Sequence, residues 1–426
     1  MTNILYAWGY AANLGHINFF LQIVKKLQAK GYNIRTTMPF FTHNSSHITN
    51  ILIENELVFL DIPNIQIKIN DEKIGSHVEL IQQQSCFRTE DDFQYSFKSW
   101  LTLFKEEMPD LVICDFAPVA LLTARQLGIP TVLFDLGFFV SGAHQILPSF
   151  VDFPISSLQT FHNAPLTNAE KKSEERLLEI VNATFSVLNF PPLEKFTDFY
   201  KADKTLWLNH PELFPFTHTN TSFSGIATRE DSGIVCPWKL NRFESPKIFA
   251  YLKQDDPASM IIIQALKYHK NLDVIVYIPN CHSEIKRAYD SDNLIIEYEP
   301  LNISQILENA DLIINNTDTD LIAQSLLAGK PLLLAPTSFE QCLNTNRAVK
   351  LGAAIRMQPE VTHTSVMQGV FTLLGNGYYT VSARAFALKY KPIDAEMVAD
   401  TIIETISANE MDLSASTQEL ENVAIN

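Results

Sequence analysis

The sequence predicts an α/β fold built from two doubly wound, Rossmann-like domains. The chain has 426 residues, which is too long for one ordinary domain and suits two. An apolar run at residues 3–8, a turn, and a helix-period segment ended by Gly31 open the chain as strand, loop, helix and strand. The same order recurs at residues 312–335. Units of this kind build parallel sheets covered by helices on both faces.

The second unit shows where a ligand would bind. Residues 312–314 form an apolar run, and a polar turn at residues 315–318 follows it. Gly329 and Pro331 end the helix after the turn, and residues 332–335 form the next strand. In a strand–turn–helix unit, the turn at the helix N-terminus is the place that binds an anionic group.

Residues 298–341 resemble the signature of the UDP-glycosyltransferase type of glycosyltransferases, which have the two-domain GT-B fold. The matching residues are Pro300, Gly329, Pro331, Pro336, Glu340, Gln341 and Asn344. The resemblance implies two facing domains, with a C-terminal helix that crosses back to the first domain. It also implies that Glu340 and Gln341 bind the hydroxyls of a sugar.

Several positions depart from that signature. The family's phosphate-binding His is Asn316 in this chain, its close-approach Gly is Asp318, and its phosphate-binding Ser or Thr is Leu321. The ribose-binding Glu of the family is Gln324 here, the base-stacking Trp is Tyr298, and the Gln after the following Pro is Leu301. The resemblance therefore implies a donor site with an altered phosphate and ribose end. Its expected members are Tyr298, Asn316, Thr317, Asp318, Thr319, Gln324, Glu340 and Gln341.

Two carboxylates in or just after this turn would affect binding of the donor. Asp318 and Asp320 would repel a diphosphate by about 1 kcal/mol per close pair in water. They would have to point away, or a divalent cation such as Mg²⁺ would bridge them to the phosphates. Two other readings stay open, an unconventional donor and a loss of transfer. The sequence predicts no bound metal and no resident cofactor, because the nucleotide sugar is itself a substrate.

The first half carries a candidate base. His16 follows Gly15 at the start of the first helix, and Asp115 stands at the carboxyl end of a strand at residues 110–114. Taken alone, His16 could simply be a loop or capping residue. The resembled family places a His and its acid partner at these positions, which implies that His16 deprotonates an acceptor hydroxyl and Asp115 orients it. A carboxylate beside a histidine fixes its tautomer and stabilises the imidazolium.

An aromatic segment follows the next strand. Residues 137–153 lack a clear period, and the candidate acceptor-binding side chains among them are Phe138, Phe139, His144 and Phe150. Apolar walls with few polar groups are typical of small-molecule sites. An ordinary loop that packs on the core is an equally good interpretation.

Composition sets limits on partners and location. The chain holds 32 Lys and Arg against 48 Asp and Glu, a net charge of −16, which disfavours binding of nucleic acid. Its five cysteines lie far apart and lack metal-type spacing, as expected of reduced thiols. The sequence shows no apolar run long enough to cross a membrane and no secretory leader, so we expect a cytoplasmic protein. Peripheral contact with a membrane remains compatible with it, and the oligomeric state is not predicted.

The expected domain organisation follows from these patterns. Residues 1–226 form the acceptor domain, 227–246 a linker, and 247–382 the nucleotide-sugar domain. Residues 383–408, with helices over 383–389 and 395–407, pack back on the first domain, and residues 409–426 form a polar tail expected to be disordered.

Three functions fit the sequence. The first is an inverting glycosyltransferase that moves a sugar from a nucleotide-diphosphate sugar to a hydroxyl of a small, apolar acceptor. The second is a non-catalytic relative that binds a sugar or an apolar ligand, in which His16 and Asp115 would not touch or the space between the domains would be blocked. The third is a sugar-nucleotide epimerase of the same fold, which would not need the aromatic segment.

Overall fold

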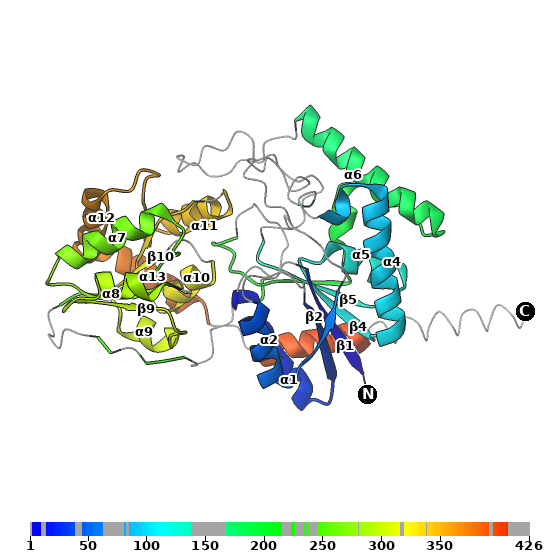
Figure 1. The fold of residues 1–426 in the computed structure, drawn as a ribbon, viewed down its shortest axis with the longest axis horizontal. Coiled ribbons are helices and arrows are strands. Elements are labelled where there is room, and N and C mark those ends of the chain that lie inside the picture. Colours follow the sequence, from blue (N-terminus) through cyan, green and yellow to red (C-terminus); the bar gives the residue numbers. More distant parts are fainter. Residues whose placement is uncertain are drawn as a thin grey trace, which may run out of the picture.

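The fold is that of a computed structural model of the chain (Figure 1). The structure describes residues 2–9, 14–38, 45–62, 81, 85–137, 167–214, 223–225, 233–235, 237–238, 245–279, 281–315, 319–337, 339–391 and 395–407. Within these ranges only the backbone is described at residues 14–19, 38, 45–48, 51, 61, 85 and 339.

The first lobe is built on a parallel sheet with the strand order β3-β2-β1-β4-β5-β6. Its described strands are β1 (Asn3–Trp8), β2 (Asn33–Met38), β3 (Val58–Asp61), β4 (Leu111–Asp115), β5 (Thr131–Asp135) and β6 (Lys204–Trp207). The order reverses between β1 and β4, where Tyr6 pairs with Ile113 and Trp8 pairs with Asp115. This is the switch point at which doubly wound sheets bind ligands.

The second lobe repeats this topology. Its sheet has the order β12-β11-β10-β7-β8-β9, which is the same winding with the six strands counted from β7. Its described strands are β7 (Lys247–Tyr251), β8 (Asp273–Tyr277), β9 (Leu294–Glu297), β10 (Leu312–Asn315), β11 (Leu332–Leu334) and β12 (Ala354–Arg356). Its switch point lies between β7 and β10, where Asn315 pairs with Tyr251.

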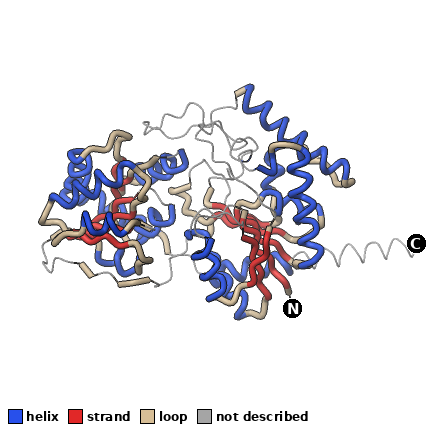
Figure 2. The backbone as a smooth tube through the Cα atoms, viewed as in Figure 1, coloured by secondary structure: helices blue, strands red, loops and turns tan. Residues whose placement is uncertain are grey.

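Helices cover both faces of each sheet (Figure 2). In the first lobe α4 (Glu90–Glu107), α5 (Pro118–Gln126) and α6 (Asn168–Val187) share one core, and α1 (Leu14–Ala29) and α2 (Ser45–Glu54) share the other. In the second lobe α9 (Ile303–Asn309), α10 (Thr319–Leu327), α11 (Phe339–Lys350) and α13 (Gly377–Lys389) cover one face, and α7 (Pro257–Tyr268), α8 (Ser283–Tyr289) and α12 (His363–Gly375) cover the other. Two short 3₁₀ helices, η1 (Ser85–Phe87) and η2 (Phe196–Tyr200), join the core of the first lobe.

Local sequence signals explain where the helices begin and end. The Asp256 carboxylate caps α7 by accepting a hydrogen bond from the Ala258 amide at 2.9 Å, and Pro257 takes the first helical position, as the sequence predicts. Gly31 and Gly329, with φ of +88° and +70°, follow the ends of α1 and α10. This left-handed conformation is open to glycine at little cost, so both residues stop their helices.

The C-terminal helices divide between the lobes. Residues 395–407 contribute Val398, Ala399 and Ile402 to the core under α1, which confirms the predicted helix that crosses back to the first lobe (Figure 1). The helix predicted over residues 383–389 begins earlier, at Gly377, because Asn376 provides its N-cap. This helix, α13, packs on α10 in the core of the second lobe.

The segment after β6 links the two lobes. Leu208 belongs to the core of the first lobe, and Leu213 belongs to the core of the second. Between them, the ring of His210 lies against Phe386 and Tyr390, with ring centroids 5.1 and 4.6 Å away. The domain boundary predicted at residues 227–246 remains a prediction.

Candidate active site

The strand order brings the predicted catalytic acid to the switch point of the first lobe. Asp115 ends β4 and is 6% exposed. Successive strand residues point to opposite faces of a sheet. Leu111 and Ile113, which share the face of Asp115, lie in the core under α1, so the carboxylate points to the side of the sheet that α1 covers.

A tyrosine that the sequence analysis did not single out holds this carboxylate. The hydroxyl of Tyr6, on the neighbouring strand β1, donates a hydrogen bond of 2.6 Å to Asp115 Oδ2. Burial raises the pKa of the Tyr6 hydroxyl well above 10, and the charge of the Asp115 carboxylate raises it further. No sequence pattern pointed to Tyr6, because it reads only as one apolar residue of a buried strand.

His16 lies in the first turn of α1, in the layer toward which Asp115 points. Its side chain lies outside the described part of the structure, so contact between His16 and Asp115 remains a prediction. Phe20, one helical turn further along α1, is fully buried against the sheet and stacks on Tyr6. The backbone of α1 thus runs beside the strands that carry Tyr6 and Asp115.

The turn between these elements is tightly packed. The Gly9 amide donates a hydrogen bond of 3.0 Å to the carbonyl oxygen of Asp115. Phe116 has φ of +45°, an unusual value for a residue with a side chain. A Cβ atom on Gly9 would lie only 2.1 Å from the carbonyl oxygen of Phe116. Only glycine at position 9 allows the end of β1 to approach the turn after β4 this closely.

The second lobe places the described donor-site residues on two helices and one strand end. Thr319 begins α10, and its hydroxyl accepts a hydrogen bond of 2.8 Å from the amide of Asn344 on α11. This bond fixes the start of α10 against α11, which carries Glu340 and Gln341 in its first turn. In Figure 1 both helices lie on the side of the second lobe that faces the first.

The side chains of this group differ in their surroundings. Gln341 Oε1 accepts hydrogen bonds from the backbone nitrogen and the hydroxyl of Thr337, at 2.8 and 2.9 Å, so this oxygen already holds the loop before α11. Gln324 is 5% exposed, and its amide nitrogen has no hydrogen-bond partner among the residues that the structure describes. An unpaired buried donor is costly, and a bound ligand with an acceptor oxygen would remove that cost.

Tyr298 stands apart from the other donor-site residues. It follows β9 at the edge of the sheet, two strands away from β7 and the switch point. Its side chain is 37% exposed, and the ammonium of Lys286 lies 5.8 Å from its ring centroid. The position leaves ring surface for a planar base.

Other predicted site residues lie outside the described residues. These are Asn316, Thr317 and Asp318 in the donor turn, and Phe138, Phe139, His144 and Phe150 in the acceptor segment. The described residues contain no group of three or more His, Cys, Asp or Glu side chains that could hold a metal ion. No described helix has the length and apolar character needed to cross a membrane.

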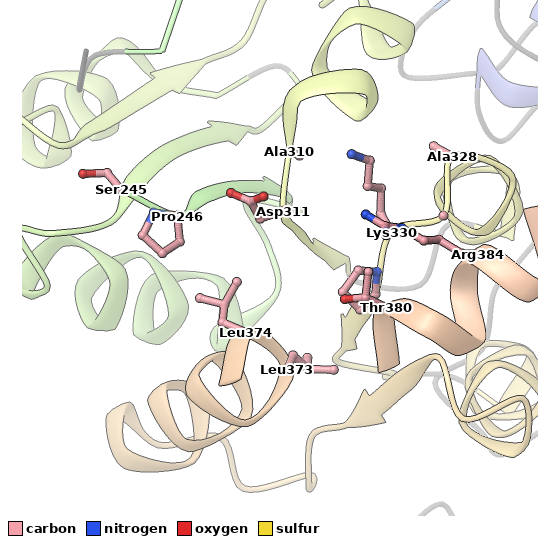
Figure 3. Close-up of a pocket in the computed structure, with 12 residues that line it drawn as sticks. Ser245, Pro246, Ala310, Asp311, Ala328, Lys330, Leu373, Leu374, Thr380 and Arg384 are labelled. Carbon is pink, nitrogen blue, oxygen red and sulfur yellow. The ribbon is translucent and has the colours of Figure 1, made fainter. Parts of the chain in front are cut away.

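A cavity of about 340 Å³ in the second lobe is not this site (Figure 3). Pro246, Asp311 and Pro331, which line it, precede β7, β10 and β11, so it lies at the amino ends of the strands. Lys330 also lines it, and its ammonium donates a hydrogen bond of 3.0 Å to the carbonyl oxygen of Glu308 near the end of α9. Asn315, which precedes the donor turn, lies at the carboxyl end of β10, at the other end of the strands.

Comparison with solved structures defines the fold: the chain has the two-domain GT-B fold of glycosyltransferases, as the sequence resemblance implied. The spinosyn forosaminyltransferase SpnP has a TM-score of 0.67 and 13% identity, over 95% of this chain and 99% of that one. VinC, in complex with DTDP, has a TM-score of 0.68 and 12% identity, over 96% of this chain and all of that one. The spinosyn rhamnosyltransferase SpnG, solved with spinosyn aglycone and with thymidine diphosphate, has a TM-score of 0.65 and 15% identity, over 94% of this chain and all of that one.

Comparisons by sequence add no family to this result. No family model matches the chain, and no curated protein matches it. At identities this low, the solved structures establish the fold alone.

Proposed function

We propose that the protein is an inverting glycosyltransferase that moves a sugar from a nucleotide-diphosphate sugar to a hydroxyl of a small, apolar acceptor. The observation that carries this proposal is the position of the two candidate sites. Asp115 lies at the switch point of the first sheet, and Asn315, the last residue before the donor turn, lies at the switch point of the second. Doubly wound sheets bind ligands at such points.

In the proposed reaction, His16 takes the proton from the acceptor hydroxyl. The acceptor oxygen then attacks the anomeric carbon of the donor, the bond from that carbon to the diphosphate oxygen breaks, and the nucleoside diphosphate leaves with the electron pair. A single displacement inverts the anomeric centre. Asp115, buried and hydrogen-bonded, would hold the imidazole in one tautomer and stabilise the imidazolium.

The second lobe would bind the donor. Backbone N–H groups of the turn at residues 316–318 and the positive end of the α10 dipole would hold the diphosphate. Each such donor aimed at developing charge lowers the barrier by roughly 3 kcal/mol. Thr319 begins this helix and is held by Asn344, so the turn would be anchored to α11.

The remaining donor contacts follow from the same placement. Gln324 would donate its unpaired amide N–H to a ribose oxygen, and Tyr298 would stack on the base. Glu340 and Gln341, in the first turn of α11, would bind sugar hydroxyls.

Calorimetric titration with uridine- and thymidine-diphosphate sugars, with and without Mg²⁺, tests donor binding. We expect at least one of them to bind. Binding that requires Mg²⁺ would mean that a cation bridges the phosphates to the turn carboxylates, and binding without Mg²⁺ would mean that the backbone suffices. If none binds under either condition, the proposal fails.

A single substitution separates transfer from binding. His16→Ala should abolish transfer to a panel of apolar alcohols and phenols, and leave donor affinity within about twofold, because the base contacts only the acceptor. His282→Ala, at an exposed histidine that precedes α8, is the control and should transfer normally. Equal loss of binding and transfer in His16→Ala would make His16 a structural residue. Donor binding without transfer in the unmodified protein would favour the non-catalytic alternative.

A further inference from the structure

The hydrogen bond between Tyr6 and Asp115 joins two buried residues that are 109 positions apart in the chain. The Tyr6 hydroxyl lies 2.6 Å from Asp115 Oδ2, and the two residues are 1% and 6% exposed. Tyr6 pairs with Ile113, and Trp8 pairs with Asp115, so Tyr6 and Asp115 lie on the same face of adjacent strands, offset by two residues along them. The length of the tyrosine side chain covers this offset.

The ring of Tyr6 is held from two sides. Its centroid lies 3.7 Å from that of Phe20 on α1, with an angle of 12° between the rings, and 6.4 Å from that of Phe134 on β5. All three rings are buried. The hydroxyl is therefore fixed in place by packing, independently of the bond that it donates.

From this geometry we infer that Tyr6 is a positioning residue of the active site: it holds the Asp115 carboxylate in one orientation, so that Asp115 in turn holds His16. The inference rests on the proposed function, in which Asp115 is the partner of His16. Tyr6 also stacks on Phe20, four residues after His16 on α1. Because Phe20 lies on the helix that carries the base, the same tyrosine would set both the acid and that helix.

Packing alone does not explain this bond. Tyr200, on η2, is also buried, and its hydroxyl has no hydrogen-bond partner within the described part of the chain, so burial of a tyrosine does not by itself supply such a bond. The Tyr6 hydroxyl meets a carboxylate at the end of a strand, at the switch point of the sheet. A hydrogen bond to an ionised carboxylate stabilises its charged form.

The groups around the pair define what a pH experiment will report. Cys114 precedes Asp115, and burial raises the pKa of its thiol, so it stays neutral near pH 7. The strand residue Asp135 lies on the opposite face of the sheet, where its charge acts on Tyr200. Among the described residues of the first lobe, Asp115 is therefore the carboxylate that acts on Tyr6.

Tyr6→Phe removes the hydroxyl and keeps the ring stack on Phe20. The Asp115 carboxylate then loses a donor and attracts a neighbouring imidazolium more strongly, so the pKa of His16 should rise. The acid limb of the profile of kcat/KM against pH should move to higher pH. We also expect kcat to fall about tenfold, because Asp115 has lost a hydrogen bond. The KM for the donor should not change, because the donor is proposed to bind the second lobe and the substitution lies in the first.

The pKa of His16 can be followed by NMR in histidine-labelled protein, with the signal assigned by its absence in His16→Gln. Tyr200→Phe is the matched control and should leave this pKa and kcat unchanged. In an Asp115→Asn background, Tyr6→Phe should cause no further change, because Tyr6 acts through Asp115. Thermal melts of all variants show whether each is folded.

The outcomes separate this inference from the function on which it rests. An unchanged His16 pKa in folded Tyr6→Phe, or an equal shift in the Asp115→Asn background, would overturn the role of Tyr6 even if the enzyme transfers sugar normally. Absence of transfer in the unmodified protein would overturn the proposed function, and the NMR measurement would still decide whether Tyr6 and Asp115 control His16.

Discussion

Gly9→Ala is the substitution whose effect the structure defines most sharply. An alanine Cβ at this position would lie 2.1 Å from the Phe116 carbonyl oxygen and 2.7 Å from the Ala117 Cα. Both neighbours are backbone atoms, so no side-chain rotation relieves the overlap. The end of β1 and the turn after β4 must separate by roughly 1 Å to restore normal contact.

The size of the effect follows from what the turn holds. Overpacking of this kind costs about 1–3 kcal/mol of stability. The displacement also strains the 3.0 Å bond from the Gly9 amide to the Asp115 carbonyl, at the residue proposed to orient the base. A shift of about 1 Å in a catalytic geometry can lower a rate about 100-fold. We therefore expect kcat to fall about 100-fold in a protein that is still folded at 25 °C.

The assay compares transfer kinetics, donor titration and urea denaturation of Gly9→Ala with those of Gly375→Ala. Gly375 ends α12, and a Cβ there would meet nothing within 4 Å, so this control should keep full transfer and gain a few tenths of a kcal/mol from helix propensity. Donor affinity should not change in either variant. Normal transfer by folded Gly9→Ala would refute the argument that the turn at Asp115 must be held in this position.

Two further predictions concern buried polar groups. Gln324→Met removes a buried amide nitrogen that has no described hydrogen-bond partner, so the protein without ligand should be more stable by about 1 kcal/mol. The same substitution should weaken binding of uridine or thymidine diphosphate about tenfold. A lower melting temperature with unchanged binding would contradict this prediction. Burial lowers the pKa of His210 to about 4 from 6.5. Because the unfolded chain takes up a proton below pH 6.5 and the folded chain only below about 4, stability should be full above pH 6.5 and fall by up to about 3 kcal/mol as the pH drops to 4. His210→Phe should lose this part of the pH dependence of urea denaturation, and an unchanged dependence would rule out His210 as its source.

Much of the fold could be predicted from local pattern, and some of it could not. The glycine stops after α1 and α10 agree with the sequence prediction, because the signals that end a helix act within a few residues. The mixed pattern of residues 38–60 predicted neither α2 nor β3. Apolar residues of both elements are exposed, Ile53 to 58% and Val58 to 52%, so neither the helical nor the strand period stands out.

The candidate site shows the same division. The sequence placed Asp115 at the carboxyl end of a strand, and it placed Thr319 and Gln324 on a helix after a polar turn, because strand ends and helix starts are marked by the residues beside them. It could not show that Tyr6 donates to Asp115, or that Asn344 donates to Thr319. Each of these bonds joins separate elements.

The sequence alone therefore determined the class of fold, the presence of two doubly wound domains, and the strand ends at which the candidate functional residues lie. The apolar period of a segment specifies which of its faces is buried, and that information is local. The tertiary structure decided which strands are neighbours: β4 beside β1 and β10 beside β7, across about 105 and 60 residues of chain. Parallel pairing depends on packing that the whole lobe shares, so only the folded protein shows that a tyrosine of the first strand holds the acid of the fourth.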